Sequence, residues 1–141
     1  MHTLLSSMRI KTIVTLTFIS LFLLSCNNHN NTKKTEVVEL ITVEEMDSLL
    51  EMGKVQLVDV RTSAEYADGH IDGAVNIDFG SDNFEMLIAE VDKSKPVAVY
   101  CGRGGRSGKC SAYMQKAGFT KIYDLDGGIT EWKYKGRELI K

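Results

Sequence analysis

One stretch of this 141-residue chain says most about its architecture: Val97-Ala98-Val99-Tyr100-Cys101-Gly102-Arg103-Gly104-Gly105-Arg106-Ser107. Its first four residues are mainly apolar and indicate a buried strand, with a cysteine at the end of that strand. The three glycines allow a tight, partly left-handed backbone that turns successive N–H groups inward. A helical pattern follows, and the positive end of its dipole adds to the same potential. Both effects favour thiolate over thiol, so Cys101 is the candidate nucleophile.

Strands and helices alternate on both sides of this stretch. Thr42 and Thr62 each precede a glutamate by three residues, which is the pattern of a capping box at a helix start. Ser107 is expected to cap the helix after the loop. The alternation predicts an α/β domain with a mainly parallel sheet and helices on both faces. The expected strands cover residues 55–60, 74–77, 97–100 and 121–125, and the expected helices cover residues 43–50, 63–68, 82–90, 107–116 and 129–134.

Two of these strands end in polar residues. Cys101 follows one strand, and Asp59-Val60-Arg61 closes another. In an open parallel sheet, ligands bind beyond the carboxyl ends of the strands. We therefore expect Cys101, Asp59 and Arg61 to lie at one rim of the sheet.

Residues 1–25 differ in composition from the rest of the chain. They contain Arg9 and Lys11, no acidic residue, and an apolar run over residues 13–24. That run is too short to span a bilayer, which needs about 20 residues, and the pattern predicts a secretory signal. A buried N-terminal helix is the alternative, but the polar residues 27–35 would leave it nothing to pack against.

The end of this segment, Leu23-Leu24-Ser25-Cys26, resembles a bacterial lipoprotein signal. In that family the cysteine is diacylated and becomes the first residue of the exported protein. The resemblance implies a signal peptide over residues 1–25, a flexible tether over residues 26–36 and a folded domain over residues 37–141. It also implies export and lipid anchoring through Cys26, on the periplasmic side or at the outer membrane. Translation could start at Met1 or at Met8, because Met8-Arg9-Ile10-Lys11 is already a complete basic head.

The charge balance argues against nucleic acid as a partner. Residues 1–25 contain two of the 17 Lys and Arg residues and none of the 19 Asp and Glu residues, so the remainder carries a net charge of about −4. Local positive charge is confined to residues 101–109. Any attachment to a membrane would therefore come from the lipid.

Cys110 lies within the helix expected after the loop. The residues alone leave two roles for it, a resolving thiol for an oxidised Cys101 or a small buried apolar side chain. With Cys26 and Cys101 assigned elsewhere, no structural disulfide framework is expected.

Several blocks in this order resemble a single-domain rhodanese, over roughly residues 37–141. They include Leu57-Val58-Asp59-Val60-Arg61, Glu65-Tyr66, the segment 69–77, Val99 to Ser107, and Leu125-Asp126-Gly127-Gly128 with Trp132. A cysteine loop alone would be a weak signal, whereas ordered blocks are a strong one. The resemblance implies a three-layer fold with a central, mainly parallel five-stranded sheet flanked by helices on both faces.

The resemblance also implies sulfur transfer through a Cys101 persulfide. The cysteine takes a sulfane sulfur from a small donor such as thiosulfate and passes it to a thiol or to cyanide. N–H groups from Gly102 to Ser107 would stabilise the thiolate and the persulfide. Arg106 matches the arginine that closes the loop in this family, and Arg103 adds a charge that could bind an anionic donor.

Other functions compete with that of a sulfurtransferase enzyme. A sulfur carrier or binding module would deliver its persulfide to a protein partner and turn over small donors poorly. Phosphatase or arsenate reductase activity is less favoured, because the loop from Cys101 to Arg106 has six residues and related cell-cycle phosphatases have seven. No general acid for an oxygen leaving group is evident either.

Polar residues outside the loop have expected supporting roles. Asp59 is expected to hold the cysteine loop by accepting hydrogen bonds from backbone or arginine N–H groups. Arg61 and Glu65, four residues apart at a helix start, are expected to form an ion pair. His70 is expected to make structural hydrogen bonds. The three histidines of the chain form no ligand cluster, so neither a metal nor another cofactor is expected, and no feature specifies an oligomeric state.

Overall fold

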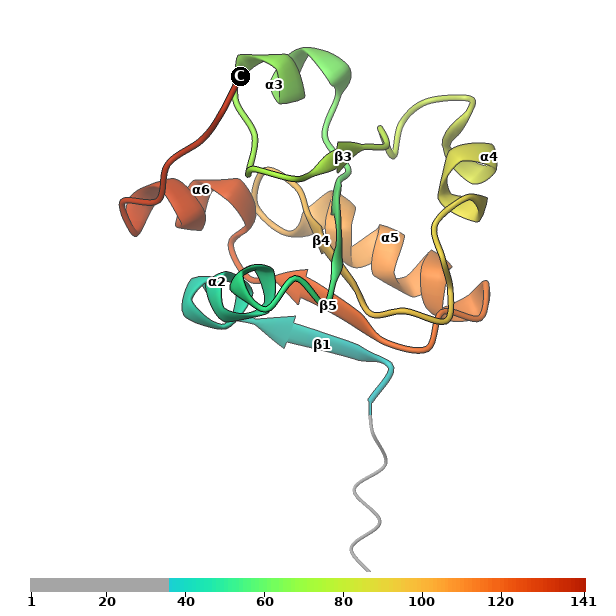
Figure 1. The fold of residues 1–141 in the computed structure, drawn as a ribbon. Helices are drawn as coiled ribbons and strands as arrows, with labels where there is room; N and C mark the ends of the chain where they lie inside the picture. Colours follow the sequence, from blue (N-terminus) through green and yellow to red (C-terminus); the bar gives the residue numbers. More distant parts are fainter. Residues whose placement is uncertain (1–35) are drawn as a thin grey trace, which may run out of the picture. The chain divides into compact units, whose positions relative to one another are not determined.

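The computed structural model describes residues 36–141, which fold around one parallel sheet of five strands (Figure 1). The strand order is β1-β5-β4-β2-β3, and every neighbouring pair is parallel. The expected α/β fold with a mainly parallel five-stranded sheet is confirmed. The strands are β1 (Val38–Ile41), β2 (Gln56–Asp59), β3 (Val75–Asn76), β4 (Val97–Tyr100) and β5 (Ile122–Leu125).

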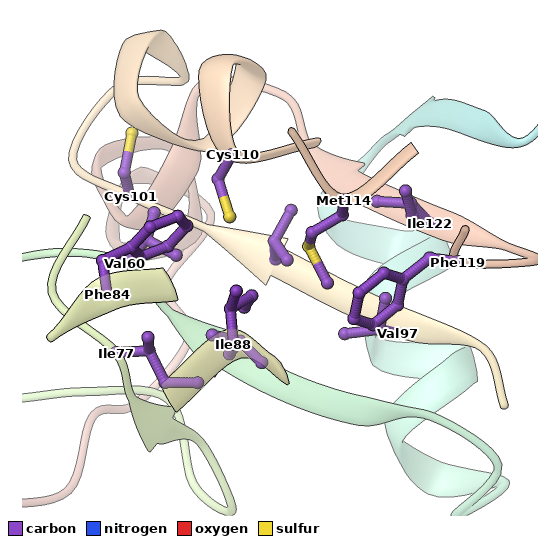
Figure 2. Close-up of a cluster of buried hydrophobic side chains, with 12 residues drawn as sticks. Val60, Ile77, Phe84, Ile88, Val97, Cys101, Cys110, Met114, Phe119 and Ile122 are labelled. Atoms are coloured by element: carbon purple, nitrogen blue, oxygen red, sulfur yellow. The ribbon is translucent and has the colours of Figure 1, made fainter. Parts of the chain in front are cut away.

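Helices cover both faces of the sheet, so the domain has three layers. Along β4, Val97 and Val99 face the α4 and α5 side, while Ala98 and Tyr100 face the α2 and α6 side. Two separate apolar clusters result, and Figure 2 shows the one beneath α4 and α5. All four β4 residues are buried, as a central strand of a parallel sheet requires. The helices are α2 (Val43–Glu51), α3 (Ser63–Asp68), α4 (Phe84–Ala89), α5 (Gly105–Lys116) and α6 (Gly128–Tyr134).

The two capping boxes predicted from the sequence are present. The Thr42 hydroxyl accepts from the Glu45 amide at 3.2 Å, and the Glu45 carboxylate accepts from the Thr42 amide at 2.8 Å. Thr62 and Glu65 make the same reciprocal pair at 3.3 and 3.0 Å. Each box satisfies donors that a helix start leaves unpaired, so α2 and α3 begin where these threonines stand.

The expected cap at Ser107 is wrong. Helix α5 begins at Gly105, and its N-cap is Gly104, with a left-handed φ of 100°. Glycine adopts that conformation without steric cost, so the helix starts three residues earlier than a cap at Ser107 would place it. Ser107 instead lies buried in the first turn, where its hydroxyl donates to the Gly104 carbonyl at 3.2 Å.

Strand β1 was not located from the sequence. It lies at one edge of the sheet and pairs with β5, with Val38 opposite Ile122. Two of its four residues, Glu39 and Leu40, are exposed, and Ile41 is the buried one. A short edge strand with this mixed pattern lacks the apolar run that marks the central strands.

The carboxyl ends of β2 and β4 lie side by side, with Asp59 opposite Tyr100. Cys101 and Arg61 therefore follow adjacent strands at one rim, as expected. The predicted signal, the Cys26 site and most of the predicted tether lie outside the described residues. Within residues 36–141, no helix has the length and apolar character needed to cross a membrane.

Candidate active site

The sulfur of Cys101 lies at the start of α5, surrounded by the backbone of its own loop. The Gly104 amide donates to Sγ at 3.1 Å, and the residue is only 2% exposed. In Figure 2 this sulfur points away from the apolar cluster, toward the turn that leads into α5. The strand end and the glycine turn thus hold the thiol at the surface of the core rather than inside it.

The loop lowers the pKa of the Cys101 thiol. Burial alone would raise that pKa, because it disfavours the charged thiolate. The amide of Gly104, which donates to Sγ, and the nearby polar groups of Ser107 and Arg103 stabilise the thiolate and outweigh the burial, so the pKa falls below the ordinary value. The site therefore favours the nucleophilic form of sulfur.

Helix α6 turns the loop carbonyls away from the sulfur. The Ile129 amide donates to the Cys101 carbonyl at 2.9 Å, and the Thr130 amide donates to the Gly102 carbonyl at 3.2 Å. This approach depends on Gly128, whose φ is 57° and whose position leaves no room for a side chain. A Cβ there would lie 2.4 Å from the Cys101 carbonyl oxygen. With those carbonyls held by α6, the N–H groups of the loop face Sγ.

Arg106 ties the cysteine loop to α3. Its two terminal nitrogens donate to the Glu65 carboxylate at 2.6 and 2.8 Å. The hydrogen bond with Arg106 is the main reason that the pKa of Glu65 falls to about 2, and Glu65 in turn raises the pKa of Arg106. The expected ion pair between Arg61 and Glu65 is wrong, because Glu65 pairs across the fold with Arg106.

Arg61 pairs with Asp59 instead. Its side chain donates to both Asp59 oxygens, with the closest contact at 2.6 Å, and its amide donates to Oδ1 at 2.9 Å. The same guanidinium donates to the Gly69 carbonyl at 2.8 Å. Asp59 thus accepts backbone and arginine N–H bonds, as expected, but both kinds come from Arg61 and not from the cysteine loop, so its expected role in holding that loop is corrected. Because the buried Asp59 carboxylate already pairs with Arg61, Glu65 is available to pair with Arg106.

A cavity of about 480 Å³ opens over the sulfur. Arg61 and Arg106 line it, and each is paired with a carboxylate. Arg103 and Lys133 also line it, and neither forms an ion pair with another residue of the described part. The cavity therefore holds two uncompensated positive charges. Lys133 was not predicted, because on sequence alone it is an ordinary exposed lysine of a short amphipathic helix.

Cys110 belongs to the core. It is fully buried, burial raises its pKa to about 12, and its sulfur points into the apolar cluster, opposite to that of Cys101 (Figure 2). Of its two expected roles, the structure matches the buried apolar side chain. His70 is also buried, with Nδ1 3.1 Å from the Tyr66 carbonyl and its ring stacked on that of Tyr66. Between residues 36 and 141, no three metal-ligating side chains come together.

Comparisons with known proteins agree with this geometry. A family model described as "Rhodanese-like domain" matches residues 42–135. The thiosulfate sulfurtransferase GlpE of Shewanella oneidensis is 34% identical over 92 residues, covering 65% of this chain and 89% of that protein. A tRNA uridine(34) hydroxylase of Erwinia tasmaniensis is 33% identical over 108 residues, covering 74% of this chain but only 31% of the hydroxylase. Among solved structures, a rhodanese-like domain protein from Staphylococcus aureus superposes with a TM-score of 0.63 at 31% identity, covering 73% of this chain and 99% of that one.

Proposed function

The chain belongs to the family of rhodanese-like domains, and we propose that it is a sulfurtransferase that carries a sulfane sulfur on Cys101. The observation that carries the proposal is the Cys101 thiol itself. Its pKa is lowered by a ring of loop N–H groups, and its sulfur lies beneath a positively charged cavity. The likeness to a thiosulfate sulfurtransferase over most of that enzyme's length supports the same chemistry.

The reaction has two halves. In the first, the Cys101 thiolate attacks the outer sulfur of a donor such as thiosulfate, a new S–S bond forms, and sulfite leaves with the electron pair of the broken S–S bond. In the second, an acceptor thiolate attacks the outer sulfur of the persulfide, and Cys101 leaves as thiolate. Both resting states of Cys101 are anions, so the same N–H groups from Arg103, Gly104 and Ser107 stabilise both.

The cavity favours an anionic donor. Arg61 and Arg106 are neutralised by Asp59 and Glu65, so their charges hold the site together. Arg103 and Lys133 are left to attract a ligand of opposite charge. A compact oxyanion such as the sulfonate part of thiosulfate fits this charge arrangement.

The competing function is a persulfide carrier that delivers sulfur to a protein partner. Its support is the likeness to part of a longer hydroxylase, of which this chain spans about a third. Turnover of thiosulfate with cyanide separates the two. A sulfurtransferase should show ping-pong kinetics at a rate far above that of a free small thiol, and Cys101→Ser should abolish them. Turnover at the level of the free thiol would contradict the enzyme and favour the carrier.

Export and lipid anchoring through Cys26 are a further part of the proposal. They are supported by the basic head, the apolar run and the Leu23-Leu24-Ser25-Cys26 motif. Labelled palmitate supplied to bacterial cells should enter the full chain and should be lost in Cys26→Ala. Labelling that survives Cys26→Ala would rule out lipid attachment at this position.

A further inference from the structure

Asp124 is an acidic residue at a core position. It stands on β5 two residues after Ile122, and both face the side of the sheet that α5 covers. Asp124 is 4% exposed, and within the described residues its Oδ1 has no hydrogen-bond partner. Its Oδ2 accepts from the Ser111 hydroxyl at 3.1 Å. An unpaired buried carboxyl oxygen is costly, so its presence calls for a physical reason.

Polar groups connect this carboxyl to the cysteine. Ser107 and Ser111 are one turn apart on α5, and both are fully buried. Ser111 donates to Oδ2, and Ser107, whose hydroxyl donates to the Gly104 carbonyl in the structure, lies close enough to Asp124 to lower the pKa of its carboxyl. Backbone also lies close to Asp124, since a Cβ on Gly108 would be 3.9 Å from Oδ2. Ser107 is the same residue whose amide and hydroxyl act on the Cys101 sulfur. The Ser107 hydroxyl therefore stands between Asp124 and Cys101.

We propose that Asp124 is a positioning residue for Cys101: in its protonated form Asp124 donates from Oδ1 to the Ser107 oxygen, which turns the Ser107 hydroxyl proton from the Gly104 carbonyl toward Sγ. In the protonated carboxyl, Oδ2 is the carbonyl oxygen and accepts from the Ser111 hydroxyl. Oδ1 has no donor to accept from, but once it carries the proton it can itself donate to Ser107. In this arrangement the thiolate and the persulfide would each receive a hydrogen bond from the Ser107 hydroxyl.

Ser107 and Asp124 also provide a path for the proton that leaves the Cys101 thiol. When the Cys101 thiol ionises while Asp124 is a carboxylate, Sγ–H gives its proton to the Ser107 oxygen, and Ser107 gives its own proton to Asp124. One S–H bond is lost and one carboxyl O–H bond forms, with no net change of charge. No oxidant, metal or external base is needed.

The electrostatic surroundings of Asp124 agree with a neutral carboxyl. Burial raises its pKa, the two serines offset this only in part, and the nearby carboxylate of Asp126 raises it further. Besides Asp126, the Cys110 thiol on α5 faces Asp124, and the charge of Asp124 contributes to the raised pKa of Cys110. Among the described residues no Lys, Arg or His forms an ion pair with Asp124. If the Asp124 carboxyl and the Cys101 thiol exchange a proton through Ser107, the two groups titrate as a pair.

The test is the rate at which iodoacetamide alkylates Cys101 in the purified protein, measured from pH 4 to pH 10. Asp124→Asn keeps a donor toward Ser107 but cannot ionise, so we expect the midpoint of the main rise to stay and any second step at higher pH to vanish. Asp124→Leu removes the donor, so we expect the midpoint to rise by somewhat less than one pH unit. The alkylation rate at pH 7 should then fall about fivefold, since a rise of one full pKa unit would lower it tenfold. Tyr113→Phe, on the same helix and with no hydrogen bond to Asp124 or Ser107 among the described residues, is the control and should leave the midpoint in place.

Two results would overturn the inference. A lower midpoint in Asp124→Asn would mean that Asp124 is a charged carboxylate that merely repels the thiolate. An unchanged midpoint in Ser107→Ala would mean that the hydroxyl does not reach the sulfur, and this holds even where Asp124→Leu does not fold. The inference rests on the proposed role of Cys101 as the reactive sulfur, but alkylation needs no sulfur donor. A protein that fails to transfer sulfur would thus still show whether Asp124 tunes its thiol.

Discussion

Arg106, in the cysteine loop, and Glu65, at the start of α3, are joined by two hydrogen bonds of 2.6 and 2.8 Å across 41 residues of sequence. Glu65 also completes the capping box of α3 with Thr62. One carboxylate therefore begins a helix and closes the loop around Cys101. Replacing Glu65 should therefore affect both the start of α3 and the closure of the loop.

Glu65→Gln should lower kcat/KM for sulfur transfer about 3- to 10-fold, because loop closure loses a charge-assisted pair. Glu45→Gln is the matched control, since Glu45 completes the same box on α2 and has no arginine partner in the structure of residues 36–141. Both variants should lose about 1 kcal/mol or less of stability, because both glutamates are solvent-accessible. Equal activity in the two variants would mean that the Arg106 link does not shape the site.

The same pair predicts a pH dependence of stability. The pKa of Glu65 is lowered from 4.5 to about 2 in the folded protein, so the unfolded chain binds its proton first as the pH falls. The stabilisation by Glu65 should be complete above about pH 4.5 and lost as the pH falls toward 2. Urea unfolding of the protein and of Glu65→Gln at several pH values should show this narrowing difference. A difference that is constant down to pH 2 would contradict the lowered pKa.

Gly128→Ala should damage the site more than a left-handed backbone alone explains. Alanine at this φ costs about 1–2 kcal/mol, and its Cβ would also meet the Cys101 carbonyl. Gly136→Ala is the control, because Gly136 has a φ of 74° with open space around it. Thermal unfolding should place Gly128→Ala well below Gly136→Ala, and only Gly128→Ala should lose sulfur transfer. Similar behaviour of the two would show that α6 does not press on the loop.

Lys133→Met should raise KM for thiosulfate about threefold or more and leave kcat nearly unchanged, since it removes an uncompensated charge from the cavity. Lys135→Met is the control, because Lys135 pairs with Glu44 at 3.2 Å and does not line the cavity over Cys101. Initial rates at low ionic strength give the comparison. The same KM for both variants would assign donor binding to other residues.

The features that could be predicted from the sequence are local ones. The capping boxes at Thr42 and Thr62 need only four consecutive residues, and strand β4 needs only its own apolar run. Each could therefore be found without knowing the fold. The cysteine loop was equally visible, because its glycines, arginines and cysteine are contiguous.

The features that were missed depend on contacts between distant segments. Glu65 has a sequence neighbour of opposite charge in Arg61, but the buried Asp59 takes that arginine, and only the fold brings Arg106 to Glu65. Asp124 resembles any acidic residue near a turn until β5 is placed beneath α5. Lys133 acquires a role only when α6 packs against the loop.

The central claim is that Cys101 carries the transferred sulfur, and intact mass spectrometry after incubation with thiosulfate tests it most directly. The protein should gain about 32 Da, the mass of one sulfur atom, in a form that dithiothreitol removes. Cys110→Ser should gain the same mass, because Cys110 is sealed in the core. Cys101→Ser should gain none. A Cys101→Ser protein that still takes up one sulfur would contradict the account.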